Sequence, residues 1–169
     1  MTKRRVITML FLGLLIGFIL KVFVFDIVKI SGTSMQPAIQ EGDMVVIWKL
    51  AYGLVKPFSP YSFTRWKEPK QGDIIAYLHN NKIVIKRCLA TEGMHLSFSS
   101  LSGYHVRIQI KETDTVIPLS EKQYQRLKMT TTVPAGFLFA VGDNYEDSID
   151  SRDYGFVAAN EVTGKVLCK

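Results

Sequence analysis

The chain has few of the residues that bind metals or build disulfide frameworks. Its 169 residues include two cysteines, Cys88 and Cys168, and three histidines. The histidines are scattered without metal-ligand spacing, there is no H-E-x-x-H pattern, and there is no glycine-rich phosphate loop. We therefore expect no metal and no other cofactor. A disulfide between the cysteines is chemically possible outside the cytoplasm, but we favour two small buried hydrophobic side chains.

Low-complexity segments and internal repeats are also absent, and the length suits one domain with a small insertion. The formal net charge is +6. Up to Lys29 there are five basic residues and one acidic residue, so 5 − 1 = +4 of this charge lies there, and the rest of the chain is nearly balanced. A basic N-terminus beside an apolar run indicates orientation in a membrane rather than binding to nucleic acid.

The apolar run covers residues 6–25, in which Lys21 is the only charged residue. Twenty residues at about 1.5 Å each are long enough for a helix to cross the hydrocarbon core. A cleavable signal peptide would need a small-x-small site, but residues 19–26 (ILKVFVFD) offer none. A buried core helix is disfavoured because the run is apolar all round. We expect a retained anchor, with residues 3–5 (KRR) in the cytoplasm and the rest of the chain outside.

Beyond the anchor, short apolar runs alternate with turn signals. An Asn80-Asn81 pair between two such runs predicts a hairpin. The pattern predicts a mainly β fold, an antiparallel β-sandwich or partly closed barrel, with one weak helix at 121–129. The predicted strands are 44–48, 74–78, 82–86, 105–110, 137–141 and 162–167.

Domain limits follow from the same pattern. We expect the cytoplasmic N-terminus and anchor at residues 1–28 and a catalytic β domain at 29–169, with a small inserted subdomain at about 94–132. Residues 50–66 are rich in aromatics and proline. They are either a loop over the core or a surface that touches the bilayer or a substrate groove.

Three motifs carry the candidate chemistry: residues 31–37 (SGTSMQP), 82–87 (KIVIKR) and 142–157 (GDNYEDSIDSRDYGFV). A serine hydroxyl needs an adjacent base to act as a nucleophile. Lys86 lies in an apolar strand, where desolvation lowers a lysine pKa and makes the neutral amine available as a base. Ser34 and Lys86 are therefore the candidate catalytic pair. The alternative for Lys86 is an ordinary lysine that protects an edge strand.

With their order behind an anchor, these motifs resemble those of the bacterial type I signal peptidases, a family of membrane-anchored Ser-Lys proteases. The resemblance implies that Ser34 is the nucleophile and Lys86 the general base. It also implies an oxyanion hole at the Ser34 N–H and at position 32, where some members carry a hydroxyl residue and this chain has Gly32. Met35 would line a shallow pocket for the small side chains that the family prefers.

The resemblance assigns supporting roles to the third motif. Ser148 would hydrogen-bond the Lys86 amine and hold it near Ser34. Asp150 and Arg152 would form a structural ion pair behind the site, and Asp143 would belong to the same supporting loop.

The implied function is removal of signal peptides from exported preproteins at the plasma (inner) membrane, by a single-pass protein with its catalytic domain outside the cytoplasm. The expected partners are preprotein signal peptides and the lipid bilayer, and the oligomeric state is left open. Two alternatives stay open: a processing peptidase dedicated to a single pilin-like or secretion-system substrate, and an inactive scaffold that binds signal peptides. An autocleaving repressor-type protease shares the serine and lysine but has no membrane anchor.

Overall fold

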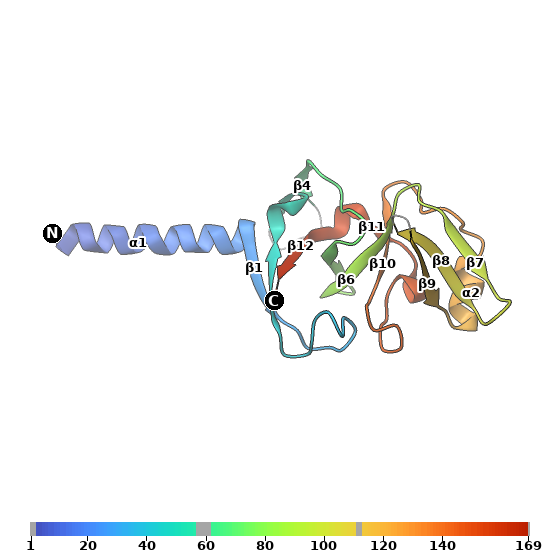
Figure 1. The fold of residues 1–169 in the computed structure, drawn as a ribbon. Helices are drawn as coiled ribbons and strands as arrows, with labels where there is room; N and C mark the ends of the chain where they lie inside the picture. Colours follow the sequence, from blue (N-terminus) through green and yellow to red (C-terminus); the bar gives the residue numbers. More distant parts are fainter. Residues whose placement is uncertain (1–2, 57–61, 111–112, 169) are drawn as a thin grey trace.

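A seven-stranded sheet forms the centre of the protein (Figure 1). The computed structural model describes residues 3–56, 62–110 and 113–168. Each pair of neighbouring strands in the sheet is antiparallel. The strand order is β1 (Phe25–Lys29), β2 (Met44–Trp48), β12 (Val162–Cys168), β5 (Ile74–His79), β6 (Lys82–Thr91), β10 (Phe137–Val141) and β11 (Val157–Ala158).

Strand β6 lies in the interior of this sheet, between β5 and β10. It is the longest strand and extends to Thr91, beyond the predicted end at residue 86. The turn between β5 and β6 is the predicted hairpin, and both of its asparagines have positive φ angles, 50° for Asn80 and 60° for Asn81. Two consecutive positive φ angles characterise the two-residue turn that suits the twist of a hairpin. Because β6 has a neighbouring strand on each side, Lys86 is not on an edge strand.

Both faces of the large sheet are covered by side chains. On β5, Ile75 and Tyr77 belong to one apolar cluster, whereas Ala76 between them belongs to another. This alternation is the one expected of a strand buried on both sides. The second cluster also holds Met35 and Ile39, so the segment that follows β1 packs against the sheet.

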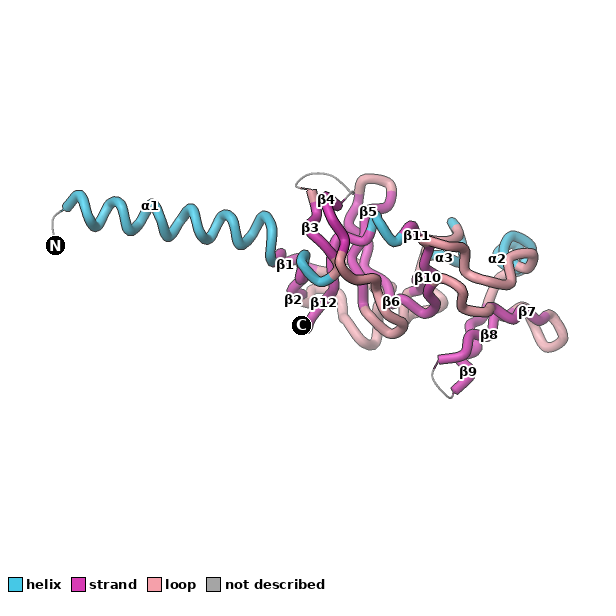
Figure 2. The backbone as a smooth tube through the Cα atoms, turned by 90° about the horizontal axis from the view of Figure 1, so that it is seen from above, coloured by secondary structure: helices cyan, strands magenta, loops and turns pink. Residues whose placement is uncertain are grey.

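A smaller sheet lies at the end of the molecule opposite the N-terminal helix (Figures 1 and 2). It falls within the 94–132 segment, and its buried side chains share one cluster with Leu89 and Phe139 of the large sheet. The two sheets therefore have a continuous core. Its elements are β7 (Leu96–Ser99), β8 (His105–Ile110) and β9 (Thr113–Pro118), followed by α2 (Glu121–Leu127).

The N-terminal helix α1 (Lys3–Ile19) continues as a π-helical turn, η1 (Leu20–Val24). Together they form a helix of 22 residues that contains an 18-residue stretch with a mean hydropathy of 2.5, and none of this stretch is buried. By length and composition it could cross a membrane. Figure 1 shows it projecting away from the β domain.

Strand β1 follows this helix without a spacer, because η1 ends at Val24 and β1 begins at Phe25. The expected domain limit at residue 28 thus falls inside a strand of the large sheet. The sequence has no boundary signal here, since the apolar residues of the helix run directly into those of β1.

The aromatic segment at 50–66 contains two short paired strands, β3 (Gly53–Val55) and β4 (Ser62–Arg65). The 3₁₀ turn η2 (Lys49–Ala51) precedes them. Phe63 and Trp66 are largely exposed, while residues 57–61 of the segment lie outside the described residues. The expectation of a bilayer or substrate contact here stays a prediction.

The mainly antiparallel β fold predicted from the sequence is confirmed, with sheets that do not close into a barrel. All six predicted strands and the helix near residue 121 are present within a few residues of the predicted limits. The prediction missed β1, β3, β4, β7, β9, β11 and the short helix α3 (Ser151–Tyr154). Most of these elements are short, and short segments carry a weak periodic signal.

Candidate active site

The side chains of Ser34 and Lys86 meet although they are 52 positions apart in the chain. The Lys86 Nζ donates a hydrogen bond of 2.6 Å to the Ser34 Oγ. Lys86 is only 4% exposed. Across from it on β5 lies Ile75, which is fully buried.

Burial lowers the pKa of Lys86 below its ordinary value, because removal from water disfavours the charged ammonium. The carboxylate of Asp150 opposes this effect, and the positive charge of Arg152 adds to it. Asp143 and Asp147 also raise the pKa. Desolvation is the largest of these effects, so the neutral amine is more available than in a solvated lysine.

The loop that carries Ser34 is held against the loop after β10. The Asn144 N–H donates to the Ser34 carbonyl at 3.0 Å, and the Asn144 side-chain amide donates to the Thr33 carbonyl at 3.3 Å. The Thr33 hydroxyl donates to the Asp147 carboxylate in a short hydrogen bond. These contacts fix the backbone on both sides of the Ser34 Cα.

Close backbone approach in this region requires a glycine. A Cβ on Gly142 would lie 2.4 Å from the Ser34 carbonyl oxygen and 2.3 Å from the Ser148 Oγ. Real Cβ atoms do not come so close to other heavy atoms, so a side chain at position 142 would push the two loops apart.

The two positions expected to form the oxyanion hole, Ser34 and Gly32, are unobstructed among the described residues. Among the described residues, no acceptor is hydrogen-bonded to the Ser34 N–H, which leaves it available as a donor. At Gly32, a Cβ would have no heavy atom within 4 Å, so a side chain would fit there. Met35, next to Ser34 in the chain, is buried and packs with Ile39 and Ile85 in the core.

Ser148 differs from its expected role. Its hydroxyl donates to the Asp150 Oδ2 at 2.6 Å, and no hydrogen bond joins it to Lys86 among the described residues. The Asp150 carboxylate is a buried, charged acceptor, which makes this a strong hydrogen bond. The hydroxyl still lies near the loop that carries Ser34, because a Cβ on Gly142 would be close both to this hydroxyl and to the Ser34 carbonyl.

The expected ion pair of Asp150 and Arg152 is present. The Arg152 Nε and Nη2 each donate to a carboxylate oxygen at 2.9 Å, and both side chains are at most 3% exposed. Arg152 also donates to the carbonyls of Tyr145 and Ser148, at 2.9 and 3.2 Å. Asp150 accepts from the Gly142 N–H at 3.0 Å. The pair therefore organises the whole loop.

Asp143 has a partner that the sequence analysis did not assign. Its carboxylate accepts from Arg87 Nε at 2.8 Å and Nη2 at 2.6 Å. Arg87 follows Lys86 on β6, so this bidentate pair ties the loop after β10 to the strand that carries the candidate base. The guanidinium also neutralises a carboxylate whose charge raises the Lys86 pKa.

The sequence analysis also missed Thr33, Asn144 and Asp147, although each lies inside a motif that it identified. Their polar character was visible, but their partners depend on how two distant loops meet.

Cys88 is buried with a free thiol, and burial raises its pKa to about 12. The side chain of Cys168 lies outside what the structure describes, so the disulfide question stays a prediction.

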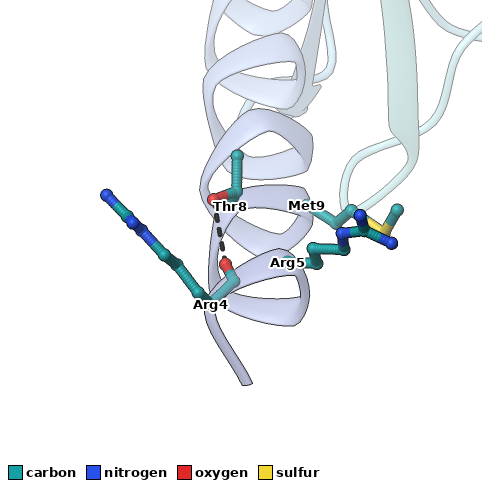
Figure 3. Close-up of a pocket in the computed structure, with 4 residues that line it drawn as sticks. All are labelled: Arg4, Arg5, Thr8 and Met9. Atoms are coloured by element: carbon teal, nitrogen blue, oxygen red, sulfur yellow. Dashed lines mark hydrogen bonds between the residues drawn. The ribbon is translucent and has the colours of Figure 1, made fainter. Parts of the chain in front are cut away.

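A surface recess on the first turns of α1 is lined by Arg4, Arg5, Thr8 and Met9 (Figure 3). The Thr8 hydroxyl donates to the Arg4 carbonyl at 2.9 Å, an ordinary bond within a helix. The recess lies at the end of α1 that is remote from the β domain (Figure 1), and it is unconnected with the Ser34–Lys86 pair.

A buried lysine amine in contact with a serine hydroxyl, in a mainly β protein, is the arrangement expected of hydrolases with a serine nucleophile and a lysine base. Comparison with known proteins narrows this class. The family described as signal peptidase, peptidase S26, matches residues 3–169. The chain therefore belongs to the S26 signal peptidases, and the protein is an enzyme of that family.

The chain is also similar to individual proteins. Signal peptidase I of Bacillus caldolyticus is 29% identical over 150 residues, which cover 87% of this chain and 80% of that protein. Thylakoidal processing peptidase 1 of Arabidopsis thaliana is 30% identical over 142 residues, covering 81% of this chain and 39% of that protein. A crystal structure of a signal peptidase I from Enterococcus faecalis is 27% identical and covers 60% of this chain and 97% of that chain, with a TM-score of 0.42.

Proposed function

We propose that this signal peptidase is a membrane-anchored serine endopeptidase that removes signal peptides from exported preproteins by a Ser-Lys acyl-enzyme mechanism. The observation that carries the proposal is the 2.6 Å contact between the buried Lys86 amine and the Ser34 hydroxyl. Family membership supports the substrate class.

In the first step, the neutral Lys86 amine accepts the proton of the Ser34 hydroxyl while the oxygen attacks the scissile carbonyl. The carbonyl oxygen becomes an oxyanion, and the Ser34 N–H, which has no acceptor within the described part of the chain, can donate to it. The Lys86 ammonium then returns the proton to the leaving amine as the peptide bond breaks. An ester between Ser34 and the signal peptide remains.

In the second step, water attacks the ester carbonyl and Lys86 takes a proton from the water. Collapse of the tetrahedral intermediate releases the signal peptide as a carboxylic acid, which loses its proton to solvent, and Lys86 returns the proton that it took from water to the Ser34 oxygen. Asp150 and Arg152 take no proton in this scheme. They hold the loop that positions Ser34, through the backbone of Gly142 and its neighbours.

The apolar helix supports a location in the membrane. Its 22 residues match the thickness of the hydrocarbon core. The basic residues at 3–5 favour a cytoplasmic N-terminus, which places Ser34 and Lys86 on the opposite side. The exposed Phe63 and Trp66 on the β domain suit contact with the same bilayer.

The test is cleavage of a precursor with an Ala-x-Ala site by detergent-solubilised enzyme. Wild type is expected to cut at that site, and Lys86→Ala is expected to lower the rate by about 10²–10⁴-fold, the usual contribution of a general base. Lys86→Arg is the matched control. It keeps the positive charge but cannot accept a proton at neutral pH, so it is expected to be as inactive as the alanine variant.

Covalent labelling separates this proposal from a binding scaffold. A serine-directed reagent should modify Ser34 in the wild type and leave Ser34→Ala unlabelled. Binding of the precursor without cutting or labelling would refute the catalytic mechanism. Activity retained by Lys86→Arg would show that a different group is the base.

A further inference from the structure

The junction between the helix and the β domain has a distinctive ionic contact. The last carbonyls of a helix lack donors within the helix, and here the chain turns directly into β1. The Phe25 N–H donates to the Leu20 carbonyl. The next carbonyls, those of Lys21 and Val22, need donors from elsewhere.

Lys49 supplies those donors. Its Nζ lies 3.2 Å from the Lys21 carbonyl oxygen and 3.2 Å from that of Val22. The same ammonium lies 3.3 Å from the Asp26 Oδ2. An ammonium has three N–H donors, and three acceptors surround this one. A cation is also favourable at the C-terminal end of a helix, where the helix dipole is negative.

Lys49 contacts both the helix and strand β1. Lys49 begins η2, directly after β2, and belongs to the β domain. Lys21 and Val22 belong to the helix, while Asp26 lies on β1 opposite Ile47 of β2. Among the described residues, the two bonds from Lys49 are the only side-chain hydrogen bonds between the helix and the β domain.

The angle at this junction decides where Ser34 stands. Strand β1 spans five residues, about 16 Å at the rise of a strand, and Ser34 follows it by five positions. A change of the angle between helix and sheet would therefore swing Ser34 toward or away from the bilayer. Without Lys49, the chain connection at Val24 and Phe25 and the packing of η1 against β1 and η2 would still join the two parts, but no side-chain hydrogen bond between described residues of the helix and the β domain would.

We propose that Lys49 is a positioning residue that fixes the β domain at one angle to the membrane helix, and thereby sets the height above the bilayer at which the Ser34–Lys86 pair cuts. The inference rests on the proposed function. The enzyme then selects a cleavage site by the distance of that site from the hydrophobic segment of the substrate, as well as by the side chains at the site.

The test uses the full-length enzyme in vesicles of phosphatidylethanolamine and phosphatidylglycerol. Three membrane-inserted precursors carry the same Ala-x-Ala site at three distances from their hydrophobic segment, and a short soluble peptide carries the site alone. Lys49→Met removes the ammonium and keeps much of the side-chain length. Lys29→Met is the matched control, because Lys29 is an exposed lysine on β1 whose ammonium has no partner among the described residues.

Wild type and Lys29→Met are expected to prefer one spacing by about tenfold in kcat/KM, a difference typical of one well-placed interaction. Lys49→Met is expected to cut all three spacings within about threefold of one another, while its rate on the soluble peptide stays within about twofold of wild type.

Retention of the wild-type spacing preference by Lys49→Met would overturn the inference. So would a parallel loss on the soluble peptide, which would show that Lys49 maintains the fold rather than the angle. A wild type that cuts the soluble peptide but shows no spacing preference would refute selection by distance and leave the proposed function intact. A wild type that cuts neither substrate would refute the proposed function and the inference with it.

Discussion

The active-site loops and the helix junction are both held by ionic contacts, but in very different surroundings. Asp150 and Arg152 are at most 3% exposed and satisfy each other with two hydrogen bonds of 2.9 Å. At the junction, Lys49 and Asp26 are 22% and 25% exposed and lie 3.3 Å apart. Water weakens the attraction between exposed charges and also lowers the cost of separating them.

This difference in exposure indicates that the two ion pairs have different roles. The buried pair holds the loop after β10 in one conformation, because separating its charges in a dry interior is costly. The junction pair contributes little to the stability of the fold and acts on the orientation of two parts. Stability and orientation can therefore be perturbed separately.

The largest effect is expected from breaking the buried pair. Arg152→Met leaves the Asp150 carboxylate buried without its charged partner, which costs about 3–5 kcal/mol of unfolding free energy. Denaturant unfolding of the purified protein measures this loss. Asp26→Asn at the junction is the matched comparison, with an expected loss of at most about 1 kcal/mol. Equal losses of unfolding free energy in the two variants would contradict different roles for the two ion pairs.

A smaller effect is expected from adding a donor to the oxyanion hole. Gly32→Ser introduces a hydroxyl where a Cβ meets nothing within 4 Å. Removal of an established oxyanion donor costs about 10²–10³-fold in kcat, and a donor added without refinement should raise kcat by up to about tenfold. Single-turnover cleavage of the soluble peptide measures the gain.

Gly142→Ser serves as the control for this prediction, because the same hydroxyl at position 142 would overlap the Ser34 carbonyl and Ser148. It should reduce activity strongly. A slower Gly32→Ser enzyme would show that position 32 does not face the oxyanion.

The smallest effect concerns pH. Lys86 must be neutral to act as the base, so kcat/KM should rise with pH through the Lys86 pKa, which burial holds below its ordinary value. The Asp147 carboxylate raises that pKa. Asp147→Asn should therefore move the acidic limb of the pH profile to lower pH, while the Thr33 hydroxyl can still donate to the amide oxygen.

The pH profile of kcat/KM for the soluble peptide checks this shift. Glu146→Gln removes the same charge one position away and should shift the limb less. A shift of the Asp147→Asn profile to higher pH would mean that loss of the Thr33 contact outweighs the change in charge.

Much of the architecture followed from local patterns. Alternation predicted β8, and paired asparagines predicted the β5–β6 hairpin. The three motifs identified Ser34 and Lys86 and the pair of Asp150 and Arg152. Strand β1 was not predicted, because the hydrophobicity of the sequence does not change where the helix ends and β1 begins. The partners of Asp143 and Thr33 were not predicted either, since each lies in a distant strand or loop. The bond from Ser148 to Asp150 depends on how their own loop folds.

The sequence by itself determined the apolar N-terminal helix, the mainly β character and the family to which the chain belongs, because composition, local periodicity and motifs carry that information. Only the tertiary structure decided that β6 is an interior strand, that the Lys86 side chain is buried away from water there, and that the Lys86 amine reaches Ser34. It also decided that Lys49 meets the end of the helix. These properties depend on contacts between residues far apart in the chain, and burial and charge act through such contacts rather than through sequence neighbours.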